Sequence, residues 1–126
     1  MNAPRELKQR CGPVSAVDLA LFAAASGDHN PLHLDAEVAR RAGFERPVVH
    51  GMLTMAYAAR LFTHAFGAGR VLMLQTRFTG VALLGDTIEF VATLTSSADG
   101  VAHYDLRAQT DRDTEVVTGT ARVATA

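Results

Sequence analysis

The sequence has few of the features that mark most specialised small proteins. Among its 126 residues Cys11 is the one cysteine, so no disulfide can form within the chain, and a reducing, cytoplasmic setting fits best. No stretch approaches the ~20 consecutive apolar residues of a membrane-spanning helix, and the N-terminal stretch "MNAPRELKQR" lacks the apolar run of a secretory signal. The formal net charge is −1, with scattered basic residues, which argues against nucleic acid as the main partner.

Apolar residues are what the chain does have. They make up 48 % of the sequence, enough to bury a core without help from disulfides or metals. The length suits a single domain spanning residues 1–126. No internal repeat, low-complexity tract or linker interrupts it.

Cap residues and helical spacing of apolar residues predict helices in the N-terminal half. Ser15 and Asp35 are suitable N-caps, and Gly27 and Gly43 stand where the first two helices would end. The last of these helices is apolar nearly all round, so we expect it to be buried. The predicted helices cover residues 16–26, 36–42 and 50–66.

The remainder of the chain is predicted to be extended. Turn signals occur at Gly85-Asp86, Asp99-Gly100 and Asp111–Asp113. The predicted strands cover residues 5–12, 70–79, 86–96, 101–110 and 115–124. A strand, then helices, then four strands gives an α+β protein in which one sheet covers one buried helix, and the hot-dog fold has this order of elements.

Titratable side chains are concentrated in "SGDHNPLHLD", residues 26–35. Pro31 makes an unbroken helix through this segment unfavourable, so Asp28 and His33 can meet only across an irregular turn, and Asn30 can hydrogen-bond the nearby backbone. Taken alone, His33 between two leucines is typical of a core histidine, and Asp28 is typical of a turn. An Asp and a His held together in a dry site are suited to proton transfer.

A second candidate element is the start of the helix over 50–66. The first N–H groups of a helix lack internal partners, and the helix dipole favours negative charge there. Gly51 has no side chain, so a substrate oxygen can approach its N–H closely, as in an oxyanion site. Carboxylate, imidazole and oxyanion donor together can add water to a carbon–carbon double bond conjugated to a carbonyl, or remove it.

The segments "FAAASGDHNPLHLD" and "RPVVHGMLTM" resemble the MaoC-like hydratase/dehydratase family, whose signature G-D-x-N-P-[LIV]-H precedes an H-G-M segment. "TRFTGVALLGD" is similar to that family's strand leading into a G-D turn. The chain departs from many relatives at Gly80-Val81-Ala82, where they have a proline, which affects the local loop and the acyl or CoA entrance.

The resemblance implies a single hot-dog fold and an (R)-specific enoyl-CoA hydratase. Asp28 and His33 would be the catalytic pair, and the Gly51 N–H would hold the thioester oxygen. The predicted substrate-binding residues are Asn30, Pro31, His50 and Met52. The thioester carrier, CoA or acyl-carrier protein, belongs to the substrate, and no cofactor or metal is expected.

The same residues bear on four other possible functions or sites. A 3-hydroxyacyl dehydratase would run the same chemistry in reverse. Many hot-dog thioesterases place a carboxylate on the central helix, and residues 51–66 contain neither Asp nor Glu. A non-catalytic acyl-thioester binding protein would be expected to lose Asp28 or His33. A zinc site on His29 and His33 is disfavoured because Pro31 breaks the helix that such a pair requires.

The expected partner is a second copy of the chain. A small hot-dog sheet leaves open edges, and edge pairing between copies would protect them. A higher homo-oligomer is an alternative, as is a heterodimer with a sister subunit of the kind that some related dehydratases need. Acyl chain length, carrier, direction and pathway are left open by the sequence.

Overall fold

A computed structural model describes residues 2–126, and Met1, part of the predicted domain, lies outside the described residues. One five-stranded sheet has the order β1-β3-β4-β5-β2, and each neighbouring pair is antiparallel. The strands are β1 (Glu6–Cys11), β2 (Val71–Phe78), β3 (Ile88–Ala98), β4 (Val101–Thr110) and β5 (Glu115–Ala124). The helices are α1 (Ala16–Ser26), α2 (Ala36–Arg41) and α3 (Gly51–Phe66), with 3₁₀ turns η1 (Pro31–His33) and η2 (Ala68–Arg70).

The predicted helix caps and hairpin turn are found in the structure. Ser15 caps α1 in a reciprocal capping box with Asp18, and the Asp35 carboxylate accepts from the first backbone N–H groups of α2. Asp99 and Gly100, with φ of 54° and 74°, form the tight turn between β3 and β4, as the left-handed pair of a two-residue hairpin requires.

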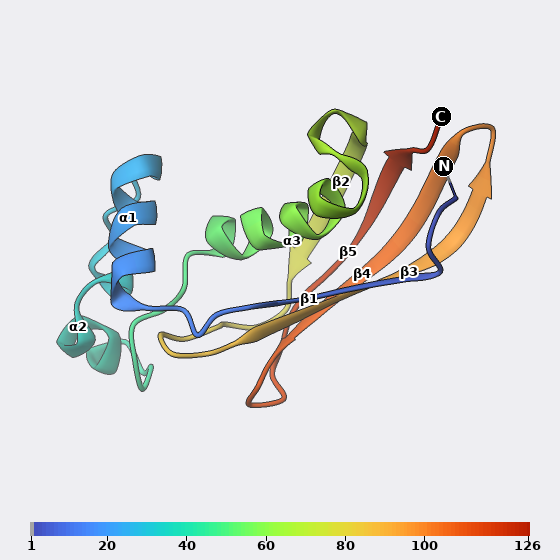
Figure 1. Cartoon of the computed structure of the whole chain (residues 1–126). Coiled ribbons are helices and arrows are strands. Elements are labelled where there is room, and N and C mark those ends of the chain that lie inside the picture. Colours follow the sequence, from blue (N-terminus) through green and yellow to red (C-terminus); the bar gives the residue numbers. More distant parts are fainter. Residues whose placement is uncertain (1) are drawn as a thin grey trace.

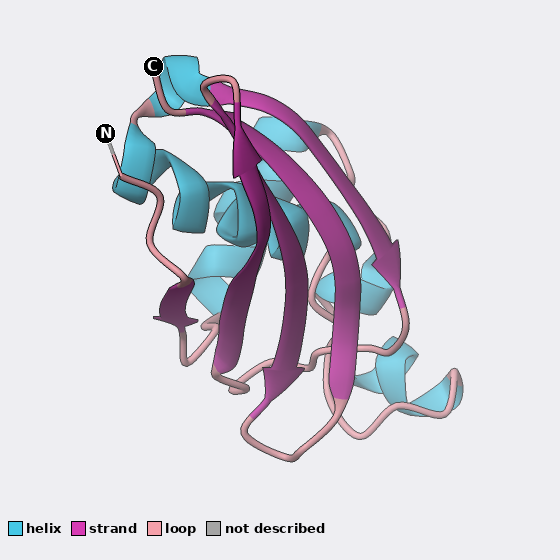
Figure 2. Cartoon of the chain, turned by 90° about the vertical axis from the view of Figure 1, so that its right-hand side faces the viewer, coloured by secondary structure: helices cyan, strands magenta, loops and turns pink. Residues whose placement is uncertain are grey.

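Helix α3 lies against one face of the curved sheet (Figure 1 and Figure 2), and buried residues of the helix and the sheet form one core cluster. Alternate residues of β4, among them Tyr104 and Leu106, are buried on that face and pack in one cluster with Phe62 and Phe66 of α3. The sheet and its central helix give the predicted α+β hot-dog arrangement. No helix among residues 2–126 is long and apolar enough to cross a membrane.

The expectation that α3 is buried is confirmed for one face of the helix. Its inner face carries buried Leu53, Leu61 and Phe62, whereas Met52 is 59 % exposed and Ala56 is also exposed. A single curved sheet covers only one side of a helix, so the apolar residues of the other side stay uncovered.

Helices α1 and α2 lie beyond the N-terminal end of α3 (Figure 1). The loop between α1 and α2 therefore reaches the first turn of α3, and the chain returns to the same place after β2. Val48 forms an isolated antiparallel bridge with Leu83, which joins the segment before α3 to the loop between β2 and β3. This end of the molecule carries the candidate site.

Candidate active site

The loop after α1 brings Asp28 and His33 together. Gly27 ends α1 in the left-handed conformation, with φ of 79°, and the Asn30 side chain accepts a hydrogen bond of 3.0 Å from the Leu32 N–H. Pro31 opens the turn η1, where its fixed φ is favourable. Asp28 Oδ2 then lies 3.6 Å from His33 Nε2, so the prediction that the pair meets across an irregular turn is confirmed.

The backbone before α3 fixes the orientation of the His33 ring. Nδ1 of His33 is 2.6 Å from the Val48 carbonyl oxygen, and because that oxygen can only accept, Nδ1 carries the hydrogen. In the neutral ring the free lone pair is therefore on Nε2, which faces Asp28. The side chain of His33 is 12 % exposed and that of Asp28 is 51 % exposed, so the carboxylate is on the open side of the pair.

This geometry is suited to holding one water molecule. A separation of 3.6 Å between Asp28 Oδ2 and His33 Nε2 is too long for a direct hydrogen bond and is of the kind that a water bridges. Carboxylate and Nε2 are both acceptors, and a water has two O–H donors. The pair can therefore align a water and draw a proton from it.

His50 lies against both members of the pair. It is 1 % exposed, its Nε2–H donates to the Asp28 carbonyl oxygen at 3.1 Å, and its ring stacks on that of His33 with centroids 3.7 Å apart. Phe22 of α1 contacts the His50 ring edge to face, with centroids 4.9 Å apart. Within residues 2–126 the buried Nδ1 of His50 has no hydrogen-bond partner.

Burial lowers the pKa of His50 below its usual value. The hydrogen bond to the Asp28 carbonyl acts in the opposite direction, while the nearby His33 ring adds to the lowering. His50 is therefore the neutral, Nε2-protonated tautomer at neutral pH. The ring contacts both Asp28 and His33 while it is itself enclosed.

The first turn of α3 offers the predicted oxyanion donor. Its N-terminus has no side-chain cap, which leaves the backbone N–H of Gly51 available. The Phe78 ring of β2 lies against this residue, since a Cβ at position 51 would stand 3.3–3.5 Å from the ring atoms. The absence of a side chain at Gly51 thus permits both the packing of Phe78 and close approach to the N–H.

A cavity of about 250 Å³ adjoins these groups. His33 and Gly51 line it together, and most of its other lining residues are apolar. The lining residues are His33, Val48, Val49, Gly51, Thr54, Phe78, Gly80, Val81, Ala82 and Val116. The cavity can accept the apolar end of a substrate whose carbonyl oxygen meets the Gly51 N–H.

The residues predicted to bind substrate are found in different surroundings. The Asn30 side chain is used by the local turn, and Pro31 shapes that turn. His50 and the exposed Met52 are absent from the cavity lining. Their direct contact with substrate stays a prediction.

A divalent metal is poorly matched to this group of side chains. One ligand atom each from Asp28, His33 and His50 lie within 4.8 Å of one another. The two imidazole planes, however, are stacked and only 20° apart, so their in-plane lone pairs run side by side instead of converging on a point at the ~2.0–2.1 Å of Zn–N bonds. His29 is exposed and turned toward the Gly27 carbonyl.

Sequence reasoning missed two residues that contact the site but lie far from its other residues in the sequence. Phe78 was predicted only as the end of a strand, and Val48 only as extended chain, yet one packs on Gly51 and the other orients His33. Neither has a local sequence signal, because each acts through a contact between segments far apart in the chain.

A model of the MaoC-like domain matches residues 3–116. The (R)-specific enoyl-CoA hydratase of Aeromonas caviae is 36 % identical over 110 residues, which are 87 % of this chain and 74 % of that protein. The mitochondrial 3-hydroxyacyl-[acyl-carrier-protein] dehydratase of Arabidopsis thaliana is 38 % identical over 74 residues, 59 % of this chain and 45 % of that protein. This chain belongs to the MaoC-like domain family.

Solved structures agree with the fold. An (R)-hydratase from A. caviae involved in PHA biosynthesis superposes with a TM-score of 0.86 at 30 % identity, covering 100 % of this chain and 98 % of the other. An unliganded R-hydratase from Pseudomonas aeruginosa gives a TM-score of 0.89 at 26 % identity, covering 99 % and 82 %. Several curated relatives are much longer: the chain spans between 8 % and 45 % of their length.

Proposed function

We propose that the protein is an (R)-specific enoyl-CoA hydratase, which reversibly adds water to trans-2-enoyl thioesters and gives (R)-3-hydroxyacyl thioesters. The observation that carries the proposal is the Asp28–His33 pair, with its two acceptors 3.6 Å apart and His33 sharing a cavity with the first residue of α3. The relationship to the A. caviae hydratase supports it.

The reaction follows from the roles of these groups. The water held between Asp28 and His33 attacks C3 of the enoyl group, its O–H bond breaks, and the proton passes to the Asp28 carboxylate. The π electrons move toward the thioester oxygen, whose negative charge the Gly51 N–H stabilises. The captured proton is then delivered to C2, so no atom or electron is left over.

The size of the cavity sets which part of the substrate it can hold. About 250 Å³ is below the ~300–1,000 Å³ of pockets that enclose drug-sized ligands. We place the acyl group in this cavity and the CoA or acyl-carrier-protein moiety outside the chain. This arrangement needs no resident cofactor, because the backbone N–H replaces a Lewis acid.

A 3-hydroxyacyl dehydratase is the second candidate, since the same three groups catalyse the reverse step and the A. thaliana relative bears that name. A thioesterase or a non-catalytic acyl-thioester binding protein is less well supported. The α3 sequence has no carboxylate, and both Asp28 and His33 are present and juxtaposed.

The proposed partner is a second copy of the chain, joined through β2. This strand is at the edge of the sheet and has the half-exposed apolar side chains Leu72 and Phe78. Beside it, Met55 of α3 and residues of β2 and β5 line an open groove. The unpaired backbone N–H and C=O groups of such an edge can pair with a strand of a second copy. A cytoplasmic location, favoured by the single cysteine, stays a prediction.

The assay that tests the function follows loss of the enoyl-thioester absorbance over a series of acyl lengths, on CoA and on acyl-carrier protein, with chiral analysis of the product. We expect the (R)-3-hydroxyacyl thioester, with rates unchanged after exhaustive chelation. Formation of the (S) product, or activity that chelation abolishes and zinc restores, would overturn the proposal.

A further inference from the structure

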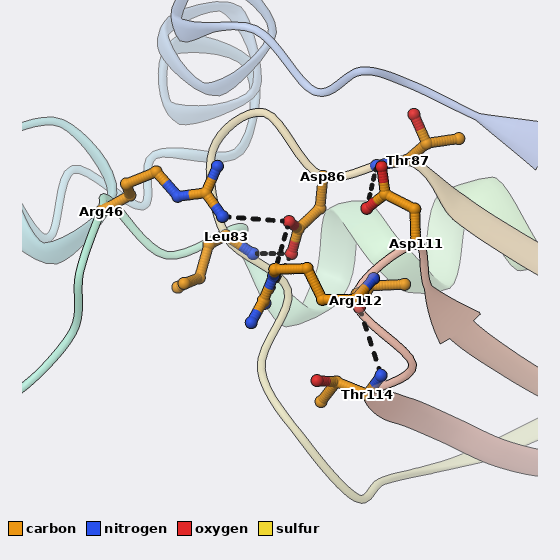
Figure 3. Close-up of polar contacts among 8 residues, drawn as sticks. Arg46, Leu83, Asp86, Thr87, Asp111, Arg112 and Thr114 are labelled. Atoms are coloured by element: carbon orange, nitrogen blue, oxygen red, sulfur yellow. Dashed lines mark hydrogen bonds and ion pairs between the residues drawn. The ribbon is translucent and has the colours of Figure 1, made fainter.

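A buried carboxylate lies in the loop between β2 and β3, next to the candidate site. Asp86 is 1 % exposed and accepts four hydrogen bonds (Figure 3). Two come from the Arg112 guanidinium, at 2.8 and 2.7 Å. One comes from Arg46 at 3.3 Å and one from the Leu83 N–H at 2.8 Å.

These partners come from three separate parts of the chain. Arg46 belongs to the segment before α3, Leu83 to the loop after β2, and Arg112 to the turn between β4 and β5. A buried carboxylate needs such partners to stay ionised. Burial alone would raise the pKa of Asp86, but the Arg112 and Leu83 hydrogen bonds and the two cationic charges outweigh it and hold the pKa below its usual value.

The loop that Asp86 organises is bonded directly to the backbone that orients His33. The Val49 N–H donates to the Ala82 carbonyl at 2.8 Å, and the Leu84 N–H donates to the Pro47 carbonyl at 2.8 Å. Val48 lies between these two bonds and pairs with Leu83. Its carbonyl accepts from Nδ1 of His33 at 2.6 Å.

We propose that Asp86 is a positioning residue for the catalytic pair: through Leu83 and Arg46 it fixes the Val48 carbonyl, which holds His33 as the Nδ1-protonated tautomer with the Nε2 lone pair toward Asp28. The catalytic consequence rests on the proposed hydratase function. The placement of the ring and its tautomer are independent of that function.

If the Val48 carbonyl were no longer held in place, it would no longer select one tautomer of His33. A neutral imidazole has its proton on either nitrogen, and the hydrogen bond at the other nitrogen decides which. If the 82–86 loop shifts, the Val48 oxygen moves with it, and His33 samples both tautomers and more than one ring orientation. With hydrogen on Nε2, the ring can no longer accept from the water that Asp28 also holds.

The experiment measures the ¹⁵N chemical shifts of the His33 ring in the substrate-free protein. The variants are Asp86→Asn, which removes the charge, and Arg112→Gln, which removes the paired bonds but leaves Arg46 and Leu83 on the carboxylate. Arg107→Gln is the control, because the Arg107–Glu115 pair at 3.1 Å is an exposed arginine–carboxylate contact away from the loop. Circular dichroism checks the folding of each variant.

We expect wild type and Arg107→Gln to show one Nδ1-protonated tautomer, and Asp86→Asn to show averaged shifts. Arg112→Gln should lie between them, and it decides the matter if Asp86→Asn does not fold. In the hydration assay Asp86→Asn should lower kcat by about 10- to 100-fold, the scale of loss that a misplaced catalytic group produces, with a smaller change in KM.

Folded variants that keep the wild-type shifts and kcat would show that Asp86 has only a structural role. A wild-type ring protonated on Nε2 would also overturn the proposal. Because the spectra need no substrate, a protein without hydratase activity but with the expected shifts would contradict the proposed function and leave the positioning role intact.

Discussion

His33 and His50 have the same side chain and lie stacked in one site, but their ring nitrogens have different partners. His33 lines the cavity, and its Nδ1 is held by the Val48 carbonyl. His50 is enclosed by Phe22, the Asp28 carbonyl and the His33 ring. What each residue does is therefore set by the partner of each nitrogen and by exposure.

The sequence could predict that Asp28 and His33 meet, but not the different surroundings of His33 and His50. Asp28, Asn30 and His33 lie within six residues of one another, so local turn chemistry brings them together. His50 is also flanked by small and apolar residues, and only its distant contacts with Asp28 and Phe22 distinguish it from a residue that faces substrate.

The lowered pKa of His50 predicts a pH dependence of stability. Because the folded pKa is below the ordinary histidine pKa of 6.5, the unfolded state takes up a proton near that pH while the folded state does not. The contribution of His50 to the free energy of unfolding should therefore be greatest above about pH 6.5 and should decrease as the pH falls toward the folded pKa. His50→Gln retains a donor for the Asp28 carbonyl but cannot titrate.

Urea unfolding between pH 7 and pH 5 measures this difference. We expect His50→Gln to lose less stability over that interval than wild type does. His64→Gln, at an exposed position in the last turn of α3, serves as the control and should follow wild type. A steeper loss in His50→Gln than in wild type would contradict the account of this ring.

At the scale of elements, the proposed mechanism requires the N-terminal turn of α3 to admit a substrate oxygen. Gly51→Ala keeps the N–H and suits a helix start, and its backbone needs no positive φ. The added methyl group would stand 3.3 Å from the Phe78 ring, beside the path to the N–H. We expect a folded protein with kcat/KM for enoyl-CoA lowered by about tenfold or more, the scale of an impaired oxyanion donor.

The matched control is Gly69→Ala in η2, where an added Cβ meets no atom within 4 Å. Its activity and melting temperature should match those of wild type. If Gly51→Ala were fully active, close approach of a substrate oxygen to the N–H of residue 51 would not require the absence of a side chain there.

Most element boundaries were predictable because local chemistry fixes them, although the predicted strand over 86–96 begins and ends two residues before β3. Ser15 and Asp35 cap α1 and α2 as expected, and the predicted strand over 101–110 coincides with β4. The irregular turn at Pro31 was predicted and is η1, whereas the exposed side of α3 was not predicted. Exposure depends on the curvature of the whole sheet, and the Asp86 cluster depends on segments that converge only in the folded chain.

At the scale of the whole molecule, the uncovered edge of β2 predicts a homodimer. Leu72→Lys puts a charge on the half-exposed apolar edge, which should disfavour pairing between copies. Sedimentation velocity should show a dimer for wild type and a larger monomer fraction for Leu72→Lys. The control Gln109→Lys places the same charge at an exposed position of the interior strand β4. A fully active wild-type monomer would contradict the prediction.

The central claim is that Asp28 and His33 act together on one water molecule. The measurement is kcat for hydration of an enoyl-CoA by wild type, Asp28→Asn, His33→Gln and the double variant, with circular dichroism as the folding control. We expect each single change to lower kcat by roughly 10²–10⁴, and the double variant to be little worse than the poorer single one. Losses that multiply would contradict the shared water, and near-wild-type activity of Asp28→Asn would show that this loop is not the catalytic site.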